Sequence, residues 1–272
     1  MRGIEAILRI EPAVLFLLCL MHTACWTTAA YIPRREPEDL PVHYSELVSM
    51  ADEKALEGAP RKQLMRALDA LEKALDLRRE PGRERMEILW RKSRVLYLLA
   101  DSATVEDPMS SWLEAGEEAG REAAGIMPER VEGHYYQAIN KGLLAQDATV
   151  GAITMVPDVA EAARRAIEID ESYDDAGPLR LLGKIYVMAP PWPASIGDLE
   201  EGISLLEKAC TVSSYPLNRL FLGEAYIEAG EKEQGLEHIY YVLRQPRKGR
   251  WAVTGERWRT YARMLLRKLE ND

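Results

Sequence analysis

Apolar residues recur at three- and four-residue spacing along the chain from His43 onward, interrupted at intervals by Pro, Gly and Asp. This spacing places apolar side chains on one face of a helix. The sustained alternation of apolar and polar residues that would predict half-buried strands does not occur there. The pattern therefore predicts an all-α protein with about ten helices.

The predicted helices repeat in pairs. Tetratricopeptide repeats place small residues where two helices approach closely and larger apolar residues between them. The clearest unit, which begins at Leu217, carries Leu222, Gly223, Tyr226, Gly230, Gly235, Ile239 and Val242 at these positions. The preceding unit carries Leu182, Gly183, Tyr186, Gly202, Leu206 and Ala209. With weaker units upstream, the chain is predicted to be a tetratricopeptide-like solenoid of about five helix pairs, and an irregular helical bundle is the alternative.

The N-terminal segment indicates export. Residues 13–21, AVLFLLCLM, have the length of a signal-peptide core and are too few to span a membrane comfortably. The next residues, His22 to Cys25, resemble a bacterial lipobox, so we expect a signal peptide at 1–24 and lipidation of Cys25. His22 stands where an aliphatic residue is usual. Cleavage after Ala30, an uncleaved anchor, or a cysteine without this role therefore remain open.

Three further segments follow. Residues 25–41 include the proline-rich, charged stretch YIPRREPEDLP and are predicted to be an extended tether. Residues 42–245 form the repeat domain, and residues 246–272 a basic C-terminal helix or cap. From Arg244 to Lys268 there are nine Lys or Arg and one acid, Glu256. One side of this helix can be formed by Val253, Arg257, Tyr261, Met264 and Leu265, so we expect an end cap with a solvated basic face. An acidic partner or anionic lipid is the functional alternative for that basic face.

Composition excludes several functions. A formal net charge of -9 argues against nucleic-acid binding, because that affinity depends on Lys and Arg. The three cysteines build no disulfide framework or CxxC metal site, and the four histidines lie far apart in sequence. HExxH, GxSxG, GxxxxGK[ST] and GxGxxG are all absent. We therefore predict no catalytic residue, metal or cofactor, although carboxylates distant along the chain leave a hydrolase as a third hypothesis.

A binding groove is predicted from the repeat register. In tetratricopeptide solenoids the first helix of each pair lines a concave surface, so equivalent positions point into one groove. The predicted groove residues are Arg91, Tyr135, Ile139, Arg180, Lys184 and Val187. Such a groove suits an amphipathic ligand or peptide whose carboxylate meets Arg91 or Arg180. Alternatively, both arginines pair with acidic residues of neighbouring helices.

Trp192 lies in the proline-rich loop APPWPASI, residues 189–196. A rigid loop that displays an aromatic side chain can anchor a partner protein. The indole can equally fill the space between adjacent helices. We favour the second interpretation and keep Trp192 as a candidate partner residue.

Two stretches resemble a known family. Residues 173–186, YDDAGPLRLLGKIY, and residues 189–198, APPWPASIGD, look like the signature region of the TatT component family associated with tripartite ATP-independent periplasmic (TRAP) transporters. These are lipoproteins with degenerate tetratricopeptide repeats, and the resemblance covers about residues 43 to 245. It implies a protein that partners a periplasmic solute-binding protein, passes it a ligand and performs no chemistry. The imperfect lipobox and the basic C-terminal segment depart from the family.

These observations favour a non-enzymatic, periplasm-facing accessory component of a TRAP-type transporter. The lipid anchor at Cys25 would hold it to a membrane, and Trp26 after Cys25, rather than Asp, favours the outer membrane. The alternative is a general scaffold of the cell envelope that recruits other proteins through the same groove. The oligomeric state, including a homo-oligomer, is left open by the sequence.

Overall fold

The computed structural model of the protein describes residues 40–105, 107–147 and 151–271. All of them belong to one structural unit, residues 36–272. The predicted signal peptide, the lipidation site Cys25 and the tether up to residue 39 lie outside the described residues. None of the described helices is long and apolar enough to cross a membrane.

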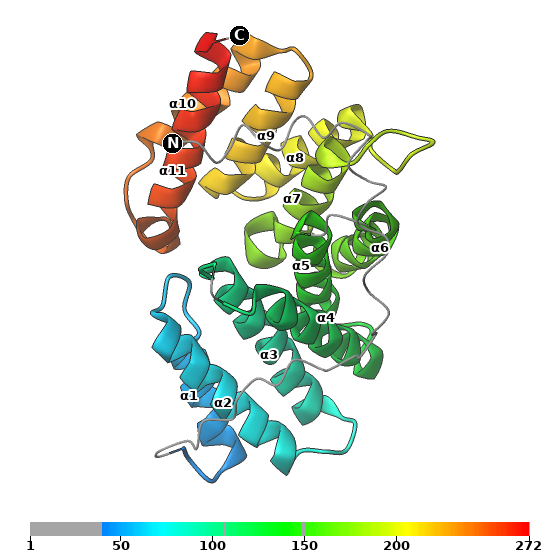
Figure 1. The fold of residues 1–272 in the computed structure, drawn as a ribbon, viewed down its shortest axis with the longest axis vertical. Helices are drawn as coiled ribbons and strands as arrows, with labels where there is room; N and C mark the ends of the chain where they lie inside the picture. Colours follow the sequence, from blue (N-terminus) through cyan, green and yellow to red (C-terminus); the bar gives the residue numbers. More distant parts are fainter. Residues whose placement is uncertain (1–39, 106, 148–150, 272) are drawn as a thin grey trace, which may run out of the picture. The chain divides into compact units, whose positions relative to one another are not determined.

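Eleven helices make up the described part of the chain, which contains no strand, so the all-α prediction is confirmed (Figure 1). The helices are α1 Tyr44–Lys54, α2 Arg61–Leu77, α3 Arg83–Asp101, α4 Met109–Ile126, α5 Val131–Asp147, α6 Ala152–Asp170, α7 Tyr173–Met188, α8 Leu199–Val212, α9 Pro216–Glu228, α10 Lys232–Arg244 and α11 Arg250–Asn271.

Helices that are neighbours in sequence pack against each other along this unit, as in stacked helical repeats. In addition, α3 contacts α5, α5 contacts α7, and α7 contacts α9. These four helices form one continuous layer. Within the described residues, α4, α6, α8 and α10 contact that layer but not one another.

Glycines allow the paired helices to approach closely. A Cβ atom on Gly183 of α7 would lie 2.8 Å from Leu206 Cγ and 3.0 Å from the carbonyl oxygen of Gly202 on α8. A Cβ on Gly223 of α9 would lie 3.0 Å from the carbonyl oxygen of Gly235 on α10. The glycine pairs that suggested the repeat pattern therefore face each other across both helix pairs, where a larger side chain would separate the helices.

The last helix buries the expected side only in part, because Tyr261 and Leu265 of α11 pack against the core whereas other residues of that side do not. Trp251, Gly255 and Ala262 of α11 are buried, whereas Val253 and Met264 are exposed. With Arg259, which is also buried, these positions follow spacings of four, four and three residues on the side of α11 that contacts α9 and α10. Apolar character alone did not identify this face, because α11 carries apolar residues on both sides.

Replacing Gly120 with Ala tests the contact between α4 and α5. A Cβ there would lie 2.7 Å from the backbone nitrogen of Gln137, which cannot move aside as a flexible side chain can. We expect the free energy of unfolding, measured with urea, to fall by about 1–3 kcal/mol. The control is Gly125→Ala on the same helix, where nothing lies within 4 Å. It should gain up to about 1 kcal/mol from helix propensity, and equal effects of the two substitutions would contradict the close approach.

Candidate functional site

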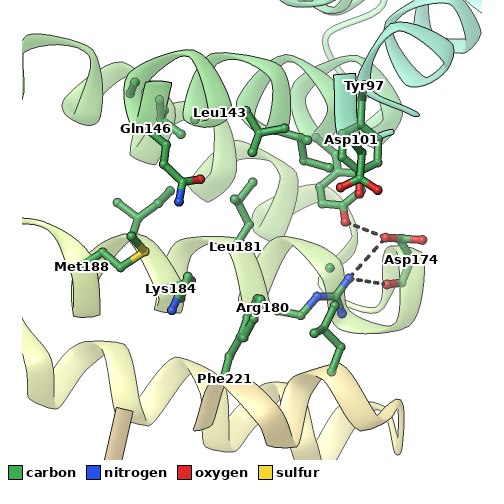
Figure 2. Close-up of a pocket in the computed structure, with 18 of the residues that line it drawn as sticks. Tyr97, Asp101, Leu143, Gln146, Asp174, Arg180, Leu181, Lys184, Met188 and Phe221 are labelled. Atoms are coloured by element: carbon green, nitrogen blue, oxygen red, sulfur yellow. Dashed lines mark hydrogen bonds and ion pairs between the residues drawn. The ribbon is translucent and has the colours of Figure 1, made fainter. Parts of the chain in front are cut away.

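A pocket of 590 Å³ lies along the layer formed by α3, α5, α7 and α9, within the size range of small-molecule sites (Figure 2). The first turns of α6 and part of α11 complete its wall. Because the pocket uses the first helix of successive pairs, it corresponds to the concave surface predicted from the repeat register.

One end of this pocket is mostly apolar, with the Gln146 side chain beside its apolar residues (Figure 2). It is lined by Leu143 near the end of α5, Ile153 and Val156 at the start of α6, and Met188 at the end of α7. Met188 is 56% exposed and Ile153 is 49% exposed, so this apolar end reaches the solvent. We call these four residues the apolar end. It offers a surface on which a hydrocarbon chain would be removed from water.

The other end is polar and is built around Asp174 of α7 (Figure 2). The Tyr135 hydroxyl donates a hydrogen bond of 2.6 Å to the Asp174 carboxylate. Arg180 pairs with the same carboxylate at 3.3 Å, and Arg250 of α11 at 2.8 Å. With Tyr97 and Asp101 of α3 these residues form what we call the polar end. Its charged groups are largely held by one another before any ligand arrives.

The backbone at the start of α7 is left-handed. Asp174, Asp175 and Ala176 have φ values of 51°, 58° and 63°, a conformation that costs a non-glycine residue roughly 1–2 kcal/mol. Arg180 Nη1 and Asn218 Nδ2 donate hydrogen bonds of 2.9 Å and 3.1 Å to the Asp175 carbonyl oxygen. These bonds offset the cost and fix the direction in which Asp174 enters the pocket.

The buried tyrosines of the polar end stay protonated. Burial, followed by the charge of Asp174, raises the pKa of Tyr135 well above its ordinary value. Burial, followed by the charge of Asp101, does the same to the pKa of Tyr97. Tyr173, which precedes Asp174 in sequence but does not line the pocket, also has its pKa raised by burial, to about 12. At neutral pH these hydroxyls are therefore uncharged groups that can donate hydrogen bonds.

Four of the predicted groove residues line the pocket, namely Tyr135, Ile139, Arg180 and Lys184. Arg180 is only 6% exposed. Besides its ion pair with Asp174, it donates a hydrogen bond of 2.7 Å to the side-chain oxygen of Asn218. Lys184 is paired with Glu224 of α9 at 2.5 Å. Both cations therefore connect α7 to α9. This agrees with the alternative prediction, in which the groove cations bind neighbouring helices instead of a ligand.

Arg91 and Val187 lie outside the pocket. The Arg91 guanidinium pairs with Asp52 of α1 at 2.9 Å and with Glu87 of α3 at 2.7 Å. The Val187 side chain faces α8, with its Cγ2 atom 2.7 Å from where a Cβ of Gly202 would be. Arg91 therefore joins α3 to α1, and Val187 packs between α7 and α8.

Several pocket residues were missed from the sequence. On α3 these are Arg94, Tyr97 and Asp101, whose three- and four-residue spacing marks one helix face. That spacing could have identified them. Arg250, Trp258 and Tyr261 of α11 also line the pocket. No local signal predicts them, since α11 reaches the site only through the fold.

The loop that carries Trp192 is ordered by its own backbone. Gly197 N donates to the Pro190 carbonyl oxygen at 2.9 Å, and Asp198 N donates to the Tyr186 carbonyl oxygen at 3.1 Å. The Trp192 side chain is 84% exposed. The expectation that the indole fills space between helices is therefore wrong, because the loop displays it to solvent.

The described residues were searched for a metal site and for a reactive cysteine. They contain no group of three His, Cys, Asp or Glu side chains that could hold a metal ion. Burial raises the pKa of the Cys210 thiol to about 11, so it remains a thiol rather than a nucleophilic thiolate at neutral pH.

Comparison with known proteins shows the fold. No protein-family model and no curated protein matches the chain. The chain is similar to the crystal structure of TTC0263, a thermophilic TPR protein of Thermus thermophilus, with a TM-score of 0.57 and 15% sequence identity. The similarity covers 82% of this chain and 100% of that chain. The predicted tetratricopeptide-like helical-repeat fold is therefore confirmed.

Arg180→Met tests the support of the left-handed turn. Removing the guanidinium group deprives the buried Asn218 side-chain oxygen and the Asp175 carbonyl oxygen of the hydrogen bonds that Arg180 donates to them. We therefore expect the free energy of unfolding to fall by about 3 kcal/mol or more. The matched control is Arg91→Met, which removes ion pairs with the exposed Asp52 and the partly exposed Glu87, with an expected loss of about 1 kcal/mol. Urea unfolding measures both. Equal stability of the two variants would show that Arg180 does not hold the turn.

Proposed function

We propose that this protein is a non-enzymatic, helical-repeat binding protein whose pocket holds a small amphipathic ligand with an anionic head group. The observation that carries the proposal is the difference in polarity between the two ends of the pocket, which is mostly apolar around Leu143 and Met188 and charged around Asp174. A ligand of matching polarity would place its hydrocarbon part at the apolar end and its head group at the polar end.

The energetics support this orientation. Each methylene group buried at the apolar end contributes about 0.8 kcal/mol. At the polar end, Tyr135, Arg180 and Arg250 are already fixed around Asp174. Little side-chain entropy is therefore lost there when a ligand binds.

A protein-binding scaffold is the second candidate, and Trp192 favours it. An exposed tryptophan on an ordered loop is the kind of side chain that dominates protein interfaces. Tetratricopeptide-like folds generally mediate protein–protein binding, which agrees with this candidate. The two functions are compatible, since the Trp192 loop begins with Ala189 and Pro190, which line the pocket.

A narrower proposal is that the partner is the periplasmic solute-binding protein of a TRAP-type transporter. It rests on the resemblance of residues 173–198 to the TatT family. This segment forms the left-handed turn, carries Arg180 and Lys184, and ends in the Trp192 loop. On this proposal the chain is anchored through Cys25 and faces the periplasm.

Leu143→Trp tests the pocket. The larger side chain should occupy the space beside Met188, so we expect decanoate to bind at least about tenfold more weakly in isothermal titration calorimetry. The control, Leu77→Trp, introduces the same residue at an exposed position on α2 that does not line the pocket. Equal decanoate affinity of both variants, or no binding to the wild type, would contradict ligand binding in the pocket.

Affinity capture of the tagged full-length protein from solubilised envelopes tests the partner. On the narrower proposal, mass spectrometry should identify a periplasmic solute-binding protein in near-stoichiometric amount. Trp192→Ala should reduce its recovery at least about tenfold, as expected for an interface hot spot. Tyr240→Ala, which removes another exposed aromatic side chain on α10, should not. Unrelated envelope proteins in place of a solute-binding protein would favour the general scaffold.

A further inference from the structure

We infer that Arg94 of α3 binds the head group of the ligand and that the ligand carries a single negative charge. This inference rests on the proposed ligand-binding function and names the ligand class of the same pocket: a monoanionic amphipathic molecule such as a medium-chain carboxylate. Its chain would run from Arg94 toward Met188.

The charges that line the pocket pair off one by one. Four acidic residues contribute to the lining, and each has its own cation. The pairs are Glu57 with Arg250, Asp101 with Arg257, Asp174 with Arg180, and Glu224 with Lys184. After this pairing, Arg94 is the one cation left over among the described residues that line the pocket.

Arg94 forms no ion pair or hydrogen bond with any residue that the structure describes. Its side chain is half-buried and lines the pocket. A guanidinium group that has lost part of its hydration without gaining a partner is unfavourable. A carboxylate can accept two parallel hydrogen bonds from it and so restore both charge compensation and hydrogen bonding.

Neighbouring groups suit a monoanion. Arg94 lies near Tyr136 and Tyr173, where its charge lowers the pKa of both hydroxyls against the larger effect of burial. Tyr97, one helical turn further along the same face of α3, also lines the pocket and is an uncharged donor. Asp101 and Asp174 line the same end, so a second negative charge on the ligand would be repelled.

Ligands that differ only in head-group charge provide the test. The probes are decanoate, decan-1-ol and decyltrimethylammonium, and calorimetry at fixed ionic strength measures their affinities for the full-length protein. We expect the wild type to bind decanoate about tenfold to a hundredfold more tightly than decan-1-ol. Arg94→Gln should bring decanoate down to the affinity of decan-1-ol, and Arg94→Lys should keep part of the difference. Arg94→Glu should reverse the preference toward decyltrimethylammonium.

The matched control is Arg91→Gln, which removes a guanidinium group one turn away on the same helix but outside the pocket. It should leave the preference for decanoate unchanged. Thermal unfolding of Arg94→Gln should match the wild type, because Arg94 has no ion pair to lose among the described residues.

The possible failures are distinguishable. If Arg94→Gln keeps the wild-type preference for decanoate while Leu143→Trp abolishes binding, the pocket binds ligands and the role of Arg94 is wrong. A wild type that binds decan-1-ol as tightly as decanoate also overturns the role of Arg94. If the wild type binds none of the three probes, the proposed function fails, and this inference fails with it.

Discussion

The pocket depends on the hydrogen bonds and the ion pair that the buried guanidinium group of Arg180 forms. This group holds the carbonyl oxygen of Asp175 and the side chain of Asn218, and through them a left-handed turn of three non-glycine residues. The turn stores strain that only surrounding hydrogen bonds can offset. Because the same guanidinium pairs with Asp174, the conformation of the backbone and the position of the carboxylate in the pocket are set together.

This arrangement also connects distant parts of the chain. Asn218 belongs to α9, and Arg250 of α11 reaches Asp174 and Asp175 as well as Glu57, between α1 and α2. The polar end is therefore a junction of the first, middle and last helices of the described unit. The geometry of these ion pairs is fixed before a ligand binds.

The features predicted correctly from the sequence are those that short stretches of residues determine. Helical spacing and the glycine pairs at 183/202 and 223/235 were sufficient for the all-α repeat fold, because helix periodicity and close helix contacts are properties of short segments. The face of α3 was not predicted correctly. Arg91 and Arg94 are one turn apart, so a small error of register in a degenerate repeat moves the choice from one to the other. The left-handed turn and the contribution of Arg250 depend on contacts between residues far apart in sequence, which periodicity does not contain.

The two ends of the pocket differ in what they can do. The polar end is bordered by residues whose charges are matched, whereas the apolar end presents Met188 and Ile153 to solvent. A ligand held by its head group at Arg94 would leave the end of its chain near Met188. The chain then continues through Ala189 and Pro190 to the ordered loop that displays Trp192. A protein docked on Trp192 would therefore lie beside the part of the ligand that the pocket covers least, which gives ligand binding and partner binding a common physical location.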